Sequence, residues 1–126
     1  MLNKGLRDQE SERIDNVLKT LLSLVYVPKK ATDEDIINIE NQLKALGLNI
    51  ESLIEIEPHN LIELLGRLHF DWNQREQFAG FLIAFSKDNP FDLKEKAISI
   101  YEHIQSESKT FSFGIFNKIA LAKANS

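Results

Sequence analysis

The chain has 126 residues, of which 43% are hydrophobic and 27% are charged, as is typical of a soluble globular protein. Its formal net charge is −4, and it has no cysteine, which excludes disulfides, thiolate metal sites and a cysteine nucleophile. Five glycines and three prolines are too few for the many turns of an all-β fold.

Two amphipathic helices are predicted in the first third of the chain, over 9–26 and from Thr32 onward. In the first, apolar residues recur every three or four positions, at Ile14, Val17, Leu18, Leu21, Leu22 and Val25. Asp8 is expected to cap this helix and Pro28 to end it. The second begins with Thr-Asp-Glu-Asp, which suits a helix N-terminus, and Gly47 is expected to end it.

Two shorter helices are predicted next, each marked by a residue typical of a helix start. Asn49 can cap a helix that runs through Ile56. Pro58 suits the first position of the following helix, which is predicted to reach about Phe70. Its apolar residues are expected to face the core: Leu61, Leu64, Leu65 and Leu68.

Three further signals complete the helical pattern. Asp71 and Gln74 form a capping-box pair before a helix predicted to end at Ser86. Asn89-Pro90 precedes the next apolar stripe, and a last helix is predicted after Ser112. The expected core residues of these helices are Phe78, Phe81, Leu82 and Phe85, then Leu93, Ala97, Ile100, Tyr101 and Ile104, then Phe113, Phe116 and Ala120.

Every apolar pattern found has helical spacing, and none alternates with the period of two that marks a strand. We therefore predict an all-α fold, with residues 1–126 forming one domain. The expected architecture is a bundle of six or seven short helices in stacked antiparallel hairpins. More than about half of the residues should be helical, well above the base rate of roughly a third.

One stretch resembles a tetratricopeptide repeat, a helical hairpin of 34 residues. The matching residues are Leu65-Gly66, Pro90 at the expected distance from the glycine, Ala97 and Tyr101. The resemblance covers residues 59–107 and implies a helical hairpin that binds a partner. Two small-residue positions of the repeat are occupied by Phe78 and Phe85, and no second repeat follows. The overall pattern is also similar to that of small all-helical bacterial proteins.

The glycine of this motif is expected to serve a close approach of two helices. Glycine inside a helix costs about 1 kcal/mol relative to alanine, so a compensating contact is expected at Gly66. Helices 58–70 and 72–86 should cross there, and Gly66→Leu should clash. The corner between them, His69-Phe70-Asp71-Trp72, is interpreted as a turn in which Asp71 is a cap and Trp72 packs over the corner.

Few residues are arranged as a catalytic or metal site. His59 and Glu63 are four apart on a predicted helix and can share one face, with His69 or Asp71 as the candidates for further ligands. His103 and Glu102 are adjacent and point in different directions on a helix. Neither a phosphate-binding glycine loop nor a nucleophile elbow is present. We expect no cofactor and no metal.

Charge is unevenly distributed along the chain. Between positions 33 and 63, one lysine accompanies eight acids: Asp33, Glu34, Asp35, Glu40, Glu51, Glu55, Glu57 and Glu63. This acidic segment is interpreted as a solvated face, with a docking patch for a basic partner as the alternative. Near the C-terminus, Phe111, Phe113 and Phe116 lie beside Lys109 and Lys118, which suggests stacking on single-stranded nucleic acid. The preferred interpretation is an aromatic helix docked into the core, and no nucleic-acid partner is expected.

The sequence therefore predicts a non-catalytic protein–protein interaction or regulatory module that self-associates. The alternative is a small hydrolase that uses a metal or an activated water held by His59, Glu63 and His69. The candidate partner-binding residues are Leu24, Tyr26, His69 and Trp72. A homodimer is expected through helix 9–26, with helix 113–124 folding over that helix as the other way to cover it. The N-terminus resembles no secretion signal and no run spans a bilayer, so a cytoplasmic protein without a membrane partner is expected.

Overall fold

The structure is a computed structural model that describes residues 6–26, 32–87, 92–108 and 113–124. These residues form seven helices: α1 (Leu6–Val25), α2 (Asp33–Ala45), α3 (Ile50–Glu55), α4 (Pro58–Arg67), α5 (Trp72–Lys87), α6 (Lys94–Glu107) and α7 (Phe113–Ala124). The described residues include no strand, and well over half of the chain is helical. The predicted all-α class is confirmed.

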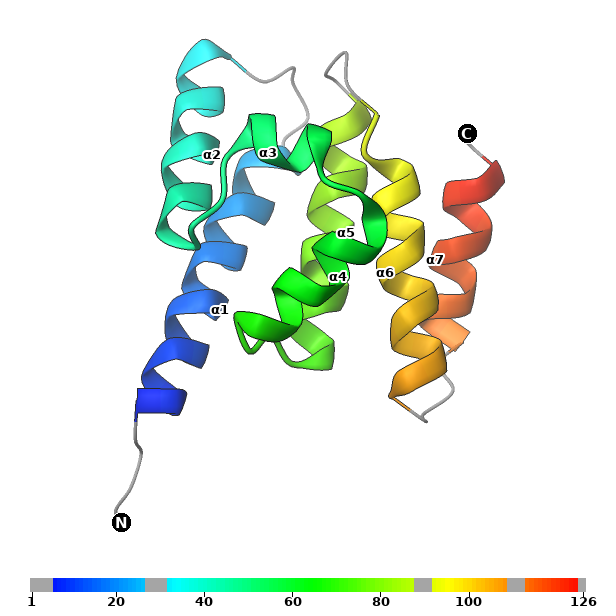
Figure 1. The fold of residues 1–126 in the computed structure, drawn as a ribbon. Helices are drawn as coiled ribbons and strands as arrows, with labels where there is room; N and C mark the ends of the chain where they lie inside the picture. The colour runs from blue at the N-terminus through cyan, green and yellow to red at the C-terminus, as the bar shows by residue number, and fades with distance from the viewer. Residues whose placement is uncertain (1–5, 27–31, 88–91, 109–112, 125–126) are drawn as a thin grey trace.

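Four helices form a row in the order α1, α5, α6 and α7, each packed against the next (Figure 1). α2 packs on α1, and α4 packs on α6. α6 runs antiparallel to both of its neighbours in the row, so the predicted antiparallel packing is present (Figure 1). α7 lies against α6 and not over α1, so the alternative in which the C-terminal helix covers helix 9–26 is wrong.

Side chains cap the helices where the sequence indicates. Thr32 accepts a hydrogen bond from the Asp35 amide at 3.1 Å, and the Asp35 carboxylate accepts one from the Thr32 amide at 3.0 Å. Asn49 caps α3 in the same way, and Pro58 is the first residue of α4. Each cap satisfies backbone N–H groups that the first helical turn leaves without a partner. The chain therefore divides into helices at positions that local sequence determines.

Some predicted boundaries are wrong. α1 begins at Leu6, so Asp8 lies inside this helix and is not its N-cap. α4 ends at Arg67, three residues before the predicted end at Phe70, because the chain turns immediately after its C-cap, Leu68. Pro28, Asn89, Pro90 and Ser112 lie outside the described residues.

α7 uses a different face from the predicted one. Ile115, Ile119 and Ala122 are buried, whereas Phe116 is 54% exposed and Ala120 is also exposed. This helix is apolar on most of its sides, so helical periodicity does not select a single face.

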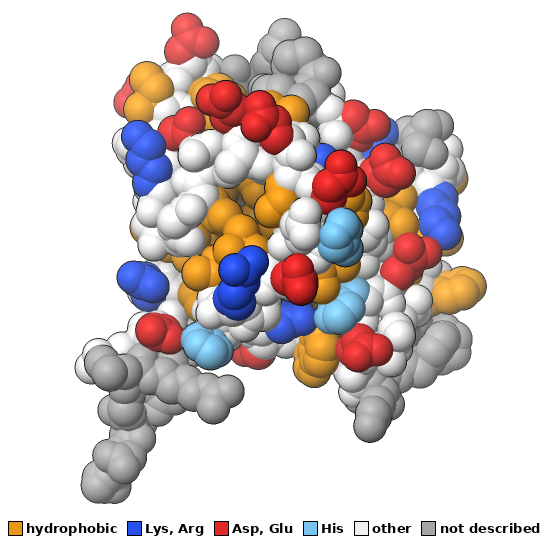
Figure 2. Space-filling view, in the orientation of Figure 1, with side chains coloured by type: hydrophobic (Ala, Val, Ile, Leu, Met, Phe, Trp, Pro, Cys, Tyr) orange, Lys and Arg blue, Asp and Glu red, His pale blue; other side chains and the backbone are white. Residues whose placement is uncertain are grey.

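One hydrophobic core contains buried residues from all seven helices. Its largest side chains are on α5, in the middle of the row, where the Phe81 and Phe85 rings stack with centroids 5.4 Å apart. Phe78 and Phe85 are 0% and 1% exposed, so the positions that a tetratricopeptide repeat fills with small residues here carry core aromatics. Acidic side chains gather over α2 and α3 at the top of one face (Figure 2). Asp33, Glu34 and Glu51 are exposed there, as expected for a solvated face.

Candidate functional site

The candidate site is a groove along α5, between the end of α1 and α7, which we call the α5 groove. It encloses about 460 Å³, within the range of roughly 300–1,000 Å³ that is typical of small-molecule pockets. The residues that line it are Tyr26, Gly80, Ile83, Lys87, Lys94, Tyr101, Lys118, Leu121 and Ala122. They come from α5, α6, α7 and the residue that follows α1.

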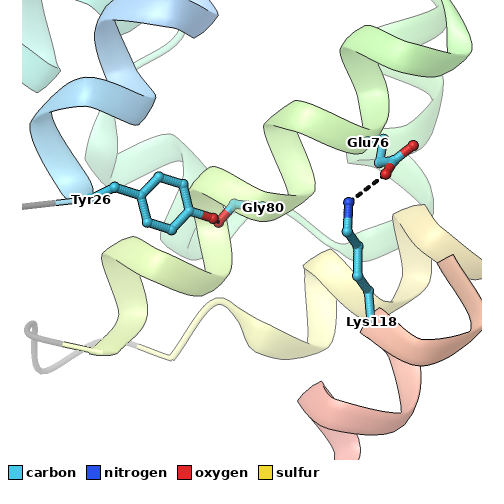
Figure 3. A network of polar contacts seen from close by, with 4 residues as sticks. All are labelled: Tyr26, Glu76, Gly80 and Lys118. Carbon is cyan, nitrogen blue, oxygen red and sulfur yellow. Dashed lines mark hydrogen bonds and ion pairs between the residues drawn. The ribbon is translucent and has the colours of Figure 1, made fainter. Parts of the chain in front are cut away.

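Gly80 forms the floor of the groove in the middle of α5. A methyl group at this position would lie 3.5 Å from the Tyr26 hydroxyl and 3.8 Å from the Tyr101 hydroxyl, so two phenols converge on the glycine. The Tyr26 hydroxyl donates a long hydrogen bond of 3.5 Å to the Gly80 carbonyl (Figure 3). Both distances to the methyl position are ordinary van der Waals contacts, so packing does not require a glycine here.

α7 forms one wall because its buried face holds it against α6. Ile115, Ile119 and Ala122 supply the apolar contact. An ion pair joins Lys118 to Glu76 of α5, and another joins Lys123 to Glu102 of α6 at 3.2 Å (Figure 3 shows the first). With α7 fixed in this orientation, Leu121 lines the groove and remains 64% exposed. An exposed leucine beside Tyr26, which is 63% exposed, leaves apolar surface at both edges of the groove.

Among the described residues that line the groove, the charged side chains are all lysines. Lys118 lies at one end in its ion pair with Glu76, and Lys87 and Lys94 line the other end. The last two are close in the fold because α5 ends where the antiparallel α6 begins (Figure 1). Burial, followed by the neighbouring Tyr26 and Glu76, raises the pKa of the Tyr101 phenol above its ordinary value, so this phenol stays neutral. The groove therefore combines apolar side chains, two phenol groups and lysine side chains.

The corner between α4 and α5, at residues 65–75, is a helix termination. The Phe70 amide donates to the Leu65 carbonyl and the His69 amide to the Gly66 carbonyl, both at 3.1 Å, which is the Schellman pattern. His69 occupies the left-handed position of this motif with φ 66°. The sequence His69-Phe70-Asp71-Trp72 is thus a turn, as predicted.

Interactions among neighbouring side chains fill this corner. The Arg75 guanidinium lies 4.7 Å from the centre of the Trp72 ring, and its Nε donates to the Phe70 carbonyl at 3.0 Å. The ring of His103 is 5.8 Å from that of Trp72. Trp72 is therefore packed against the corner, as predicted, although 39% of it remains exposed.

Gln74 joins the corner to α1, a role that the sequence did not reveal. The Gln74 side-chain oxygen accepts a hydrogen bond from the Asp71 backbone N–H at 2.9 Å. The Asp71 carboxylate accepts one from the Gln74 backbone N–H at 2.7 Å, which completes the predicted capping box. The Gln74 side-chain Nε2 donates to the Ser11 hydroxyl at 3.0 Å and to the Asp15 carboxylate at 2.9 Å. Gln74 is 1% exposed, so these bonds supply partners to a polar group removed from water.

The four residues predicted to bind a partner do not form one site. Tyr26 lines the α5 groove, and Leu24 is half-buried against the core. His69 lines a second pocket of about 350 Å³ at the corner, together with Glu10, Ser11, Gly66, Phe70, Asp71 and Arg75. Trp72 begins α5, eight residues or about 12 Å of helix before Gly80, so it is far from Tyr26.

Gly66 does not lie at a tight crossing of α4 and α5. A methyl group there would meet only the Arg75 guanidinium, at 3.6 Å, and α4 makes its main contacts with α6. The expectation that Gly66 permits a close helix approach is therefore wrong. Gly80, which also lies in the interior of a helix, is the glycine that lines the α5 groove, and no motif in the sequence distinguishes it from Gly66.

His59, Glu63 and His69 are not assembled as a metal site in the described part of the chain, where no three His, Cys, Asp or Glu side chains form a group able to hold an ion. Lys109 and Phe111, which suggested nucleic-acid stacking, lie outside the described residues. Among the helices that the structure describes, none has the length and apolar character needed to span a bilayer. Comparison of the chain with protein-family models, curated proteins and solved structures found no match.

Proposed function

We propose that this chain is a non-catalytic interaction module that binds an acidic amphipathic helix of a protein partner in the α5 groove. The observation that supports this proposal is the combination of exposed apolar edges with a lysine-rich lining in one concave surface. A helix that lies in such a groove buries apolar residues spaced by three and four positions.

The chemistry of the groove defines the partner. Tyr26 and Leu121 can contact apolar side chains of the bound helix, and tyrosine is among the residues enriched in binding hot spots. The charged side chains among the described residues that line the groove are lysines, which favours acidic residues along the flank of that helix. Complementary charge of this kind increases the association rate and disfavours basic partners.

The direct test uses two labelled helical peptides of about 14 residues that share one leucine stripe. One carries glutamates on the flanks, and the other carries lysines. Fluorescence anisotropy should detect binding of the acidic peptide with Kd on the order of 10–100 µM. The basic peptide should bind at least about tenfold more weakly, and added salt should reduce this difference. Equal binding of the two peptides, or binding of neither, would contradict the proposal.

Two serine variants locate the contact. Leu121→Ser removes an exposed apolar side chain from the groove, and Ile37→Ser removes a 60% exposed one from α2. We expect Leu121→Ser to weaken acidic-peptide binding about fivefold or more, and Ile37→Ser to leave it unchanged. Because both side chains are exposed, neither substitution should unfold the protein. If the two variants bound the peptide equally well, the docking surface would lie elsewhere.

Self-association through helix 9–26 remains a second proposal. The exposed apolar surface available for this contact is smaller than the sequence indicated, because Leu24 is half-buried and only Tyr26 of the two residues is exposed. A stable dimer should bury on the order of 1,200 Å² or more in total. Light scattering at high micromolar concentration measures the mass directly, and a monomer mass would exclude the dimer.

A further inference from the structure

We further propose that the partner helix carries one glutamine within its apolar stripe, and that the carboxamide of this glutamine hydrogen-bonds to the hydroxyls of Tyr101 and Tyr26. The proposal rests on the proposed function, because it names the residue by which the α5 groove recognises its helix. A single polar residue in an apolar stripe can fix the register of a bound helix. Tyr101 is then the residue that selects the partner.

Tyr101 is a core residue whose hydroxyl opens into the groove. The residue is 1% exposed and lines the α5 groove. Within the described part of the chain, no residue forms a hydrogen bond with its hydroxyl. Among the described residues, every side-chain nitrogen or oxygen that is closed off from solvent has a partner. The Tyr101 hydroxyl is therefore accessible from the groove, and its O–H can donate there.

A helix that covers the groove must supply a partner for this hydroxyl. In the unbound protein, water in the groove can accept its hydrogen bond. A bound helix excludes this water, and a buried hydroxyl without a partner weakens binding. A stripe made only of leucine would leave the Tyr101 hydroxyl in that state. The partner therefore needs one polar side chain at the position that faces Tyr101.

The second phenol decides which polar side chain fits. The hydroxyl oxygens of Tyr26 and Tyr101 both lie within 4 Å of the methyl position at Gly80, which they cover. Tyr26 donates its own O–H to the Gly80 carbonyl at 3.5 Å, so its oxygen is left to accept (Figure 3). Tyr101 thus offers a donor and Tyr26 an acceptor. A carboxamide has both a carbonyl oxygen and N–H groups, and with hydrogen bonds of about 2.9 Å it can reach both phenols.

A carboxylate suits this position less well. It has no N–H group to donate to the Tyr26 oxygen. Burial, followed by the charges of Tyr26 and Glu76, raises the pKa of Tyr101, so the negative charge of Glu76 acts at this hydroxyl. A carboxylate bound there would be repelled by the same charge. The ion pair between Glu76 and Lys118 weakens this repulsion but does not supply the missing donor.

The depth of the Tyr101 hydroxyl favours glutamine over asparagine. Tyr26 and Leu121, at the edges of the groove, are 63% and 64% exposed, whereas Tyr101 is 1% exposed. The Tyr101 hydroxyl therefore lies below the edges on which the helix rests, and a long side chain is needed to reach it. Glutamine has one more methylene group than asparagine, and it is compatible with a helix to about the same degree as leucine.

Three labelled acidic peptides test this recognition. They share the glutamate flanks and the leucine stripe of the acidic peptide above, and they differ only at the central inward position, which is glutamine, glutamate or leucine. These three residues have similar helix propensities, so the peptides should be equally helical. Fluorescence anisotropy with the full chain should show that the glutamine peptide binds about threefold to tenfold more tightly than either of the others.

Hydroxyl-deletion variants locate the contact. Tyr101→Phe keeps the buried ring, and it should weaken binding of the glutamine peptide about threefold to tenfold without weakening binding of the leucine peptide. The preference for glutamine should then disappear. Tyr26→Phe should also weaken binding of the glutamine peptide. Ser99→Ala is the control, because it removes a half-buried hydroxyl from α6 that does not line the groove, and it should leave all three affinities unchanged.

The melting temperature shows whether the Tyr101 hydroxyl serves the fold instead. Because no described residue bonds to it, Tyr101→Phe should melt within about 4 °C of the parent protein. A larger loss would overturn the proposal, as would a preference for glutamine that survives Tyr101→Phe.

The peptide series can also overturn it. The proposal is wrong if the leucine or the glutamate peptide binds as tightly as the glutamine peptide, if Tyr26→Phe has no effect, or if Ser99→Ala acts like Tyr101→Phe. Should the leucine peptide still bind the parent protein in those cases, the proposed function stands alone. If none of the three peptides binds, the proposed function fails as well.

Discussion

The corner at residues 65–75 and the α5 groove both contain a helix-interior glycine, but their polar groups are used differently. At the corner, Gln74 donates a hydrogen bond to Ser11 of α1, Arg75 donates one to the Phe70 carbonyl, and Trp72 contacts both Arg75 and His103. In the groove, the phenols and lysines surround about 460 Å³ of open space. The corner contains the residues that the sequence marks as unusual, and their contacts stabilise the fold. The groove, which no motif marks, is the better candidate for binding.

The largest difference between the two regions should appear in stability. Phe78 is fully buried, and its ring meets those of Phe70 at 5.9 Å and Phe81 at 6.0 Å, so it links the corner to the core. Phe78→Ala should lower the free energy of unfolding by about 3–5 kcal/mol. Leu121→Ala in the groove should change it by less than about 0.5 kcal/mol. Urea denaturation measures both, and similar losses would show that α7 and its groove are part of the structural core.

A smaller effect is expected at the polar link between the corner and α1. Gln74→Glu replaces the amide that donates to Asp15 with a second carboxylate, which should cost about 2–3 kcal/mol at neutral pH. Gln77→Glu on the same helix, at a half-buried position, is the control and should cost less.

The loss caused by Gln74→Glu should also depend on pH. Burial and the charge of Asp15 raise the pKa of the introduced carboxyl in the folded state, so the folded state binds its proton more tightly than the unfolded state. The deficit relative to Gln77→Glu should therefore narrow as the pH falls toward about 4. A deficit that is independent of pH would mean that shape, not charge, causes the loss.

Substitutions at the two helix ends that have a left-handed residue should change the free energy of unfolding by about 1 kcal/mol, in opposite directions. Gly47 follows α2 with φ 77°, and His69 follows α4 with φ 66°. A residue with a side chain loses about 1–2 kcal/mol in this conformation, partly balanced by the greater backbone entropy that glycine loses on folding. His69→Gly should thus stabilise the protein and Gly47→Ala destabilise it, each by about 1 kcal/mol in chemical denaturation. No gain from His69→Gly would show that the imidazole makes a compensating contact.

Local features of the fold were predictable from the sequence because they depend on neighbouring residues. The Thr32 and Asn49 caps, Pro58 at the start of α4, the left-handed Gly47 and the Asp71–Gln74 pair all follow from residues within one helical turn.

The candidate site could not be predicted in the same way, because it depends on which helices become neighbours. The groove exists because α1 packs beside α5, and because Ile115 and Ile119, not Phe116, turn inward on α7. α7 is apolar around most of its circumference, so periodicity alone did not fix its orientation. For Gly66 and Gly80, a helix-interior glycine indicated a special position, but the sequence could not show that the Tyr26 and Tyr101 hydroxyls converge on Gly80.

The smallest expected effect concerns pH and His103, a half-buried residue that packs on Trp72. Burial, followed by the charge of Arg75, lowers the pKa of His103, and Glu107 opposes this shift. The unfolded state then binds the proton more tightly, so stability should fall as the pH decreases through the ordinary histidine value of about 6.5. Since much of the side chain contacts water, the change in melting temperature between about pH 7.5 and 5.5 should be at most about 2 °C.

His103→Gln should remove this pH dependence, and His59→Gln, at an exposed position, is the control. Binding of the labelled acidic peptide should not follow the same pH profile, since no histidine lines the α5 groove. Calorimetric scans of the three proteins, with titrations at both pH values, separate the two regions. If protonation of His103 changed the affinity for the acidic peptide as well as stability, the corner and the groove would be coupled through α5 and α6, and the contrast between them would no longer hold.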